Sequence, residues 1–341
     1  MTDPTPELNS PRRIFVFEHV CGGGMIDEPI PPALAAQGYA MLAAVIEDFV
    51  RDGRQVTTLR DGRVDAVPGA DERVPDDAAH CADLFDDAAR RADAVLIVAP
   101  ECDGHLEGWT RRLEAVDARS LGCTREAVCL CADKRALTRH LECAGVPVPV
   151  MHEGMPPTRA RIVSRPRFGA GCEETWLHRA APSPMPADDG RVLHEFVPGC
   201  AASVSLVVQG DAAIALPAGR QQIRLGESDP ASVDYQGGVL PLDEPLQQRA
   251  AALGRRAVAA VPGLRGFVGV DLVLAGRADD DVVLEINPRL TMSYVGLRAL
   301  CTTNLARALL DTSVMPPFRE GSVSFDAAGV LYEIAPSRYR P

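Results

Sequence analysis

The segment GFVGVDLVLAGRADDDVVLEINPR, residues 266–289, contains two apolar runs separated by a short polar stretch with glycine. This arrangement predicts a β-hairpin. Side chains alternate between the two faces of a strand, so one face of this hairpin should be apolar. The expected members of that face are Val270, Leu272, Leu274, Leu284 and Ile286. Asp271, Glu285 and Asn287 should lie together on the opposite face.

The three polar residues of this hairpin form a candidate metal site. Asp271 falls opposite Glu285 if the loop holds an odd number of residues around Ala278, and Asn287 follows one step along the same face. Opposed β-carbons lie about 4.5–5.5 Å apart, and two carboxylates with an amide oxygen suit a hard divalent cation. The alternative is a solvated outer face with scattered acids. The Asn-Pro-Arg turn that follows is unlike ordinary surface sequence, so we predict metal binding.

The basic residues of the chain are almost all arginine. Of 35 basic residues one is lysine, at position 134, and the other 34 are arginine. Lysine is a compact point charge and arginine a broad planar fork, so a tight phosphate site need not accept the exchange. Lys134 is therefore a candidate phosphate-binding residue, and the alternative is chance survival of one lysine on a helix surface.

Composition limits the class of partner. The chain has 341 residues and a formal net charge of −12, which argues against nucleic acid or an anionic membrane, since both attract basic surfaces. We find no apolar run that approaches the roughly 20 residues of a membrane helix. The ten cysteines include no CxxC pair. We expect a cytoplasmic protein with reduced thiols that acts on small molecules, with its oligomeric state left open, a homodimer included.

The first part of the chain alternates strands with helices. The expected strands are 14–17, 55–59 and 94–99, and the expected helices are 32–51 and 76–91. This order is typical of an open parallel α/β sheet, whose functional loops follow the strand ends. Those loops are 18–24 and 100–104. We expect a flexible tail over residues 1–12 and an N-terminal α/β domain over residues 13–119.

The remainder of the chain predicts two α+β lobes, a small one over residues 120–192 and a C-terminal one over residues 193–341. One helix is expected from Thr124 to Cys143, and a flexible stretch from about residue 217 to Leu242. The other expected elements are strands 161–166, 175–178, 203–208 and 212–216, helices 244–261 and 294–310, and a Pro-rich connector over 181–190.

These motifs, in this order, resemble the ATP-grasp superfamily. Gly266-x-x-Gly-x-Asp271 followed by Glu285-Ile-Asn-Pro-Arg289 is similar to its metal-binding strands, and Asp133-Lys134 before a helix is similar to its first phosphate-binding lysine. Residues 161–171 resemble its phosphate-covering hairpin and residues 195–199 its adenine hinge. The resemblance covers roughly residues 14–311. It implies an ATP-grasp fold of α/β and α+β parts, with ATP bound between two α+β lobes.

The resemblance also implies roles for individual residues. Asp271, Glu285 and Asn287 would hold Mg²⁺, with Mn²⁺ as a substitute. The implied nucleotide contacts are Lys134, Arg165, Gly169, Gly171, Glu195, Phe196 and Val197. Arg289 would hold a transferred phosphoryl group or a substrate carboxylate, and Arg220 would lie near the substrate. The family usually has lysine where Arg165 stands, although arginine can also bind phosphate oxygens.

Finer motifs resemble the tyramine–glutamate ligase group of methanofuran-type cofactor biosynthesis. They are FEHVCGGG at 17–24, APECDG at 99–104, YQGG at 235–238 and NPRLTMSYVG at 287–296. The implied substrate contacts are Glu18, Gly22, Gly23, Gly24, Glu101 and Tyr235. Alternatively, the glycines form a tight turn and Tyr235 packs in the core.

The function implied by this group is that of an ATP-dependent ligase. It would join a carboxylate, glutamate, to a tyramine- or tyrosine-like amine through an acyl phosphate and release ADP. Two alternatives stay open. One is an ATP-grasp ligase with another dipeptide or a polyglutamate product, and the other is a catalytically silent nucleotide-binding regulatory protein.

Overall fold

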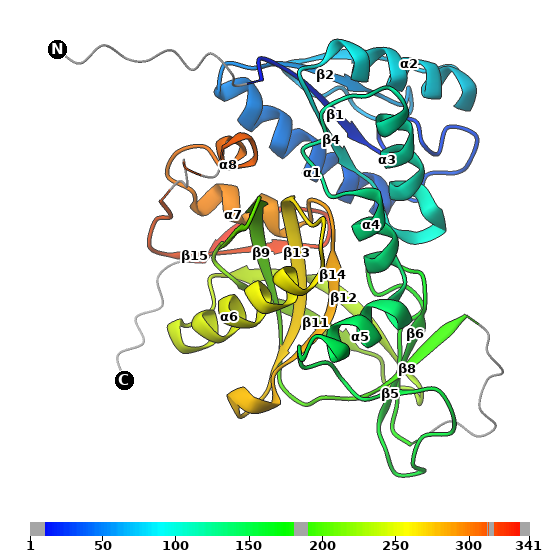
Figure 1. Ribbon diagram of the computed structural model, residues 1–341, viewed down its shortest axis with the longest axis vertical. Coiled ribbons are helices and arrows are strands. Elements are labelled where there is room, and N and C mark those ends of the chain that lie inside the picture. The colour runs from blue at the N-terminus through cyan, green and yellow to red at the C-terminus, as the bar shows by residue number, and fades with distance from the viewer. Residues whose placement is uncertain (1–10, 181–189, 312, 314–316, 335–341) are drawn as a thin grey trace.

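The computed structural model describes residues 11–180, 190–311, 313 and 317–334. Its N-terminal part is a four-stranded parallel sheet of order β3-β2-β1-β4 with helices on both faces (Figure 1). The strands are β1 Arg13–Glu18, β2 Gln55–Leu59, β3 Ala70–Arg73 and β4 Ala94–Val98. The helices are α1 Pro32–Arg51, α2 Ala78–Arg91 and α3 His105–Ala115, with a 3₁₀ turn η1 at Cys102–Gly104. The expected open parallel α/β sheet is confirmed, with β3 as an additional strand.

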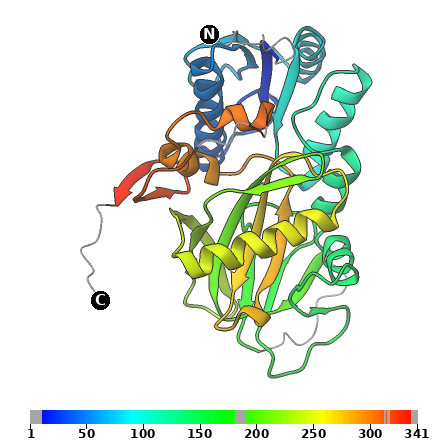
Figure 2. The ribbon, with the colours of Figure 1, turned by 60° about the vertical axis from the view of Figure 1, so that its left-hand side comes forward.

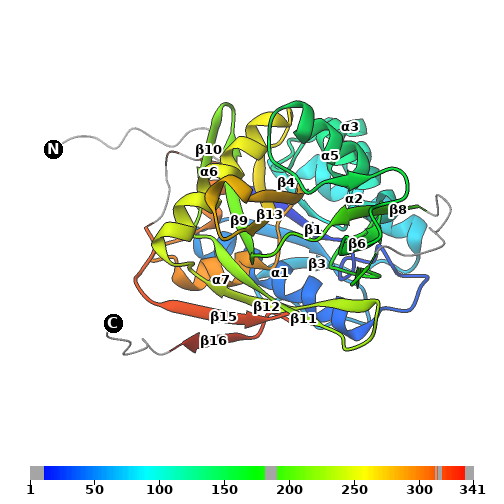
Figure 3. The same cartoon turned by 90° about the horizontal axis from the view of Figure 1, so that it is seen from below.

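The rest of the described chain forms one twelve-stranded antiparallel sheet, with β14-β13-β9-β11-β12-β7-β6-β8-β5 as its main path (Figure 3). Its strands are β5 Met151–His152, β6 Ile162–Pro166, β7 Trp176–His178, β8 Arg191–Glu195, β9 Cys200–Gln209, β10 Ala212–Ala215, β11 Gly219–Leu225, β12 Ala231–Leu240, β13 Gly266–Leu274, β14 Val282–Asn287, β15 Ser322–Asp326 and β16 Leu331–Ile334. The helices are α4 Arg125–Ala132, α5 Lys134–Cys143, α6 Glu244–Ala260, α7 Ser293–Leu300 and α8 Ala306–Leu310, with a 3₁₀ turn η2 at Ala278–Asp280. The long helix α6 covers one face of β9, β13 and β14 (Figure 2).

Three stretches differ from the expected secondary structure. The single helix expected from Thr124 to Cys143 is two helices, because Asp133 has extended backbone angles and caps α5 with its carboxylate. The expected helix 294–310 is also two, interrupted after Leu300 where Cys301 is extended. The stretch expected to be flexible forms β11 and β12. The expected tail and connector lie, apart from residues 11, 12 and 190, outside the described residues.

Helix α1 is the one helix, in the part of the chain that the structure describes, whose length and composition would suffice to cross a membrane. The expectation that no such apolar run exists was therefore wrong. Here α1 is a core helix that packs on β1, β2, α7 and α8. Its buried Asp48 accepts hydrogen bonds from the Tyr294 hydroxyl at 2.7 Å and from the Arg298 guanidinium at 2.8 Å. This network ties α1 to α7.

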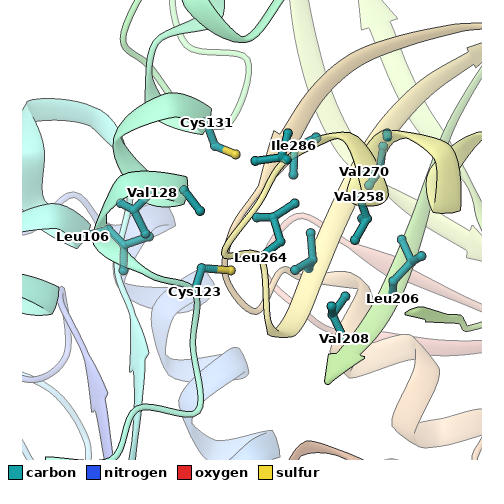
Figure 4. Packing of buried hydrophobic residues seen from close by; sticks show 14 of the residues in the cluster. Leu106, Cys123, Val128, Cys131, Leu206, Val208, Val258, Leu264, Val270 and Ile286 are labelled. Carbon is teal, nitrogen blue, oxygen red and sulfur yellow. The ribbon is translucent and has the colours of Figure 1, made fainter. Parts of the chain in front are cut away.

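Two clusters of buried apolar residues run from the N-terminal sheet into the large sheet. One joins β1 and α1 to α7 and α8. The other joins the opposite face of β1 and helices α3 and α4 to β9, β13 and α6. In Figure 4, Val128 and Cys131 of α4 point toward Leu264 and Ile286. This shared packing holds the ends of β1 and β4 against the hairpin β13–β14.

Candidate active site

The predicted register of the hairpin β13–β14 is confirmed. Asp271 pairs directly with Glu285, and Gly269 with Asn287. One expectation about this hairpin was wrong: Leu284 does not join the apolar face but lines a cavity on the other side. A β-bulge shifts the register after Asp271, so Leu272 pairs with Val283. A bulge places two residues opposite one and reverses the alternation beyond it.

The carboxylates of Asp271 and Glu285 are charged unequally. Asp271 accepts hydrogen bonds from the Gln221 amide at 2.8 Å and the Asn287 amide at 3.1 Å. Burial and the neighbouring Glu285 charge nevertheless raise the pKa of Asp271 to about 7. Burial alone would also raise the pKa of Glu285, but Lys134 and Arg165 outweigh it and lower that pKa. The pair therefore holds excess negative charge that a cation would neutralise.

The donors at this site fit a hard divalent cation. Within the described ranges, no set of three His, Cys, Asp or Glu side chains is placed to hold a metal ion. The protein offers two carboxylates and the side-chain amide of Asn287 instead. Mg²⁺ commonly binds through one or two carboxylates and completes its shell with water and substrate phosphates, so this donor set suits Mg²⁺ or Mn²⁺ together with a nucleotide.

Two cations converge on Glu285, one from α5 and one from β6. The Lys134 ammonium donates a hydrogen bond to the Gly169 carbonyl at 2.5 Å and lies 3.9 Å from the Glu285 carboxylate. The Arg165 guanidinium donates to the same carboxylate at 3.0 Å and to the Leu284 carbonyl at 2.7 Å. Both side chains are largely buried, at 9 % and 11 % exposure. The structure thus brings the single lysine and the arginine beside the candidate metal site.

These groups line one end of a cavity of about 320 Å³ between the strands β6–β8 and β9–β14. All seven predicted nucleotide contacts line it: Lys134, Arg165, Gly169, Gly171, Glu195, Phe196 and Val197. Gly171 has φ of +67°, a left-handed conformation that favours glycine. The Arg161 guanidinium stacks 3.9 Å over the Phe196 ring. The Glu195 carboxylate lies 3.1 Å from the His152 ring.

Arg289 connects this site to the N-terminal sheet. Its guanidinium forms a two-point ion pair with Glu101, with Nε–Oε1 and Nη2–Oε2 both at 2.9 Å. Glu101 follows β4, and Glu18 ends β1, the neighbouring strand. The Glu18 carboxylate is buried and accepts a hydrogen bond from the Cys21 backbone N–H at 2.6 Å. Burial raises the pKa of Glu18, and the Arg289 charge opposes that shift.

The glycines after β1 are accounted for by close packing. A β-carbon on Gly22 would lie 2.5 Å from the Glu18 carbonyl oxygen, and one on Gly24 would lie 2.0 Å from the His19 ring. Gly23 has φ of +94° and lies against Pro75. The three glycines therefore form a tight turn, which was the alternative to substrate contact. The structure gives Gly22 and Gly23, both buried, no open face toward a substrate.

Strand β11 presents Gln221, rather than Arg220, to the site. Arg220 pairs with Ala202, which pairs with Leu272 on the apolar face, so Arg220 lies on the opposite face from Asp271 and is exposed. Gln221 was missed because its strand was expected to be flexible. Tyr235 pairs with Ile223, a cavity residue, and burial together with the Asp271 charge raises the pKa of Tyr235. Tyr235 therefore lies beside the site. Cys172 and His194 are further cavity residues without an assigned role.

A parallel α/β sheet followed by an antiparallel sheet, with cations and carboxylates meeting at a cavity, is the arrangement found in ATP-grasp proteins. The chain has the ATP-grasp fold and contains an ATP-grasp domain. The family described as ATP-grasp domain matches residues 131–293, and the pre ATP-grasp 3 domain matches residues 54–128.

Relatives and solved structures agree with this assignment. The chain is 27 % identical over 206 residues, 60 % of its length, to the tyramine–L-glutamate ligase of Methanocaldococcus jannaschii, and similarly to that of Methanocaldococcus fervens. The matched stretch spans 58 % and 62 % of those relatives, less than two thirds of either. An ATP-grasp superfamily protein from Archaeoglobus fulgidus is 25 % identical, with a TM-score of 0.74 and 92 % of each chain covered. An L-amino acid ligase from Bacillus licheniformis, 17 % identical, shares the fold with a TM-score of 0.66, over 92 % of this chain and 79 % of that one.

Proposed function

We propose that this protein is an ATP-dependent ligase that joins glutamate to a tyramine- or tyrosine-like amine in the cytoplasm. The observation that carries the proposal is the meeting of Lys134, Arg165 and Arg289 around Glu285, between a nucleotide-sized cavity and the N-terminal sheet. The names of the two curated relatives support the choice of substrates.

The side chains divide the work between the nucleotide and the substrates. Lys134 and Arg165, which contact Glu285 here, would bind phosphate oxygens of ATP, while Asp271, Glu285 and Asn287 would hold Mg²⁺. The metal ion, when bound, would neutralise phosphate charge. Gly169 and Gly171 would cover the phosphates, and the backbone of Glu195, Phe196 and Val197 would border the adenine. Gln221 would keep Asp271 oriented.

The reaction needs no protein nucleophile. The substrate carboxylate attacks the γ-phosphorus of ATP to give an acyl phosphate and ADP, and the amine then displaces phosphate from that carbonyl carbon. Residues therefore act by positioning and by neutralising charge. Arg289, which lies in the turn after β14, would hold the substrate carboxylate and later the acyl phosphate. Arg165 keeps a cation beside Glu285, which favours an active enzyme over a silent nucleotide-binding protein.

The test is product analysis with L-glutamate, tyramine, ATP and Mg²⁺. We expect stoichiometric ADP and phosphate and an amide with the mass of one glutamate joined to one tyramine. Glu285→Gln should abolish turnover and leave the far-ultraviolet circular dichroism spectrum unchanged, because one ligand charge is lost and the shape is kept.

Other products would identify the alternatives. A different dipeptide or a polyglutamate mass would change the substrates within the same class. ATP binding without ADP release stimulated by any acid and amine would indicate a silent protein. AMP with pyrophosphate would contradict the acyl phosphate.

A further inference from the structure

The ion pair between Glu101 and Arg289 joins parts of the chain that are 188 positions apart. Both of its contacts are 2.9 Å, and the side chains of Glu101 and Arg289 are only 7 % and 13 % exposed. Glu101 lies at the carboxyl end of β4, next to β1. In open α/β sheets, ligands bind at this edge, where the connections turn to opposite faces. The pair thus lies where a ligand of the N-terminal sheet would be expected.

The pair lies outside the nucleotide cavity but near Glu285. Among the described residues that line the nucleotide cavity, Glu285 is present but Arg289 and Glu101 are not. Arg289 nevertheless lies close enough to Glu285 for their charges to interact. A carboxylate that attacks a phosphate held at Glu285 must come from the side that the nucleotide does not fill. We place the Glu101–Arg289 pair on that side, because Arg289 connects the Glu285 end of the cavity to the N-terminal sheet.

A single charged substrate cannot displace this pair without a penalty. Removing one partner from a buried ion pair leaves the other charge without compensation, which is strongly unfavourable. An acid bound to Arg289 would leave Glu101 unpaired, and an amine bound to Glu101 would leave Arg289 unpaired. An acid and an amine together replace both charges, because the substrates carry opposite signs.

We infer that Glu101 binds the ammonium group of the amine substrate. In the protein without substrates Glu101 and Arg289 pair with each other, and the two substrates together replace this ion pair. The inference rests on the proposed function and adds to it the binding site of the amine and a linkage between the substrates. Each substrate strengthens the binding of the other, because each one releases the partner that the other needs.

The experiment measures substrate affinity by calorimetry, with a non-hydrolysable ATP analogue and Mg²⁺ present, and KM values by ADP release. In the wild-type protein, saturating tyramine should tighten L-glutamate binding by a factor of about 5–150. In Glu101→Gln that coupling should fall to about onefold, since a neutral side chain neither competes for Arg289 nor attracts ammonium. The KM for tyramine should then rise about tenfold or more, while the Kd for L-glutamate alone falls.

Two variants make these opposite shifts interpretable. Asp281→Asn breaks the comparably buried Arg249–Asp281 pair, which links α6 to the loop before β14, and it should leave the coupling unchanged. Glu101→Asp keeps the charge and should restore much of the tyramine affinity. The inference is overturned if Glu101→Gln weakens the binding of both substrates to the same extent, or if the variant keeps the wild-type coupling. Turnover by the wild-type protein would in that case still support the proposed function. Absence of ADP release from the wild-type protein with every acid and amine pair overturns both.

Discussion

At the scale of single residues, the fold strongly perturbs the ionisation of Asp271. Its carboxyl ionises near pH 3.8 in an unfolded chain, and burial beside Glu285 raises its pKa to about 7 in the folded protein. The folded state therefore holds a proton that the unfolded state has released. Stability from this group falls as the pH rises between about 4 and 7, because the unfolded chain binds fewer protons there.

We expect the metal-free protein to lose thermal stability from pH 5 to pH 7.5, and Mg²⁺ with an ATP analogue to reduce that loss. Asp271→Asn should flatten this part of the profile, because an amide does not titrate. The measurement is the Tm at several pH values. A wild-type profile that matches the variant's would show that the pKa of Asp271 is not raised in the folded state.

Several site residues could be predicted because their signals are local. Strand alternation placed Asp271, Glu285 and Asn287 on one face, and the rarity of lysine singled out Lys134. Leu284 could not be placed, because nothing in the residue spacing shows where a bulge interrupts a strand. The partner of Arg289 was equally hidden, since pairing with Glu101 depends on how two distant strand ends meet.

At the scale of elements, the break between α4 and α5 positions Lys134, the residue that we propose binds phosphate. Asp133 accepts hydrogen bonds from the Arg135 and Ala136 backbone N–H groups, both at 3.1 Å, and its carboxylate pairs with Arg167 of the covering hairpin. The Lys134 backbone N–H donates to the Arg167 carbonyl at 3.1 Å. One aspartate therefore starts α5 and fixes the hairpin beside it.

Two substitutions should separate these roles. Asp133→Asn keeps an oxygen for the cap and removes the charge, so the partly exposed ion pair alone is lost, at about 0–1 kcal/mol. Asp133→Ala removes the cap as well and should cost about 0.5–2 kcal/mol more. Urea unfolding measures both. Equal losses would mean that the cap contributes nothing.

Elements whose apolar residues recur with a clear periodicity could be predicted from the sequence, and elements without such a periodicity could not. The bounds of α1 and β2 agree with expectation, since α1 has apolar residues at helical spacing and β2 is rich in β-branched residues. Strands β11 and β12 were missed because most of their exposed residues are polar and their cavity-lining residues include the polar Gln221. Such sequences become extended because they pair with neighbouring strands of the sheet.

At the scale of the whole molecule, the two shared apolar clusters predict a single unfolding transition. The only tryptophans are Trp109, in α3, and Trp176, in β7. Fluorescence of Trp176→Phe reports on Trp109 beside the N-terminal sheet, and fluorescence of Trp109→Phe reports on Trp176 in the antiparallel sheet. The two urea midpoints should agree with each other and with circular dichroism. Separate midpoints would show that the parts fold independently.

Asp48→Ala should destabilise that common transition, because Arg298 and the Tyr294 hydroxyl lose their buried partner. We expect a loss of about 3–5 kcal/mol in the free energy of unfolding. The control is Arg91→Ala, which removes an exposed pair with Asp87 and should cost less than about 1 kcal/mol. A loss no larger than the control's would contradict the role assigned to Asp48.

The single lysine also gives the chain one bond that a lysine-specific protease can cut. That bond follows Lys134, so complete cleavage yields residues 1–134 and 135–341 and no other fragments. The bond lies at the first turn of α5, and the side chain that the protease must engage is 9 % exposed at the end of the nucleotide cavity. Cleavage therefore requires local opening of this segment. The cleavage rate should fall when ATP and Mg²⁺ are added. The ratio of cleaved fragments to uncut chain on a gel then measures how often the site opens.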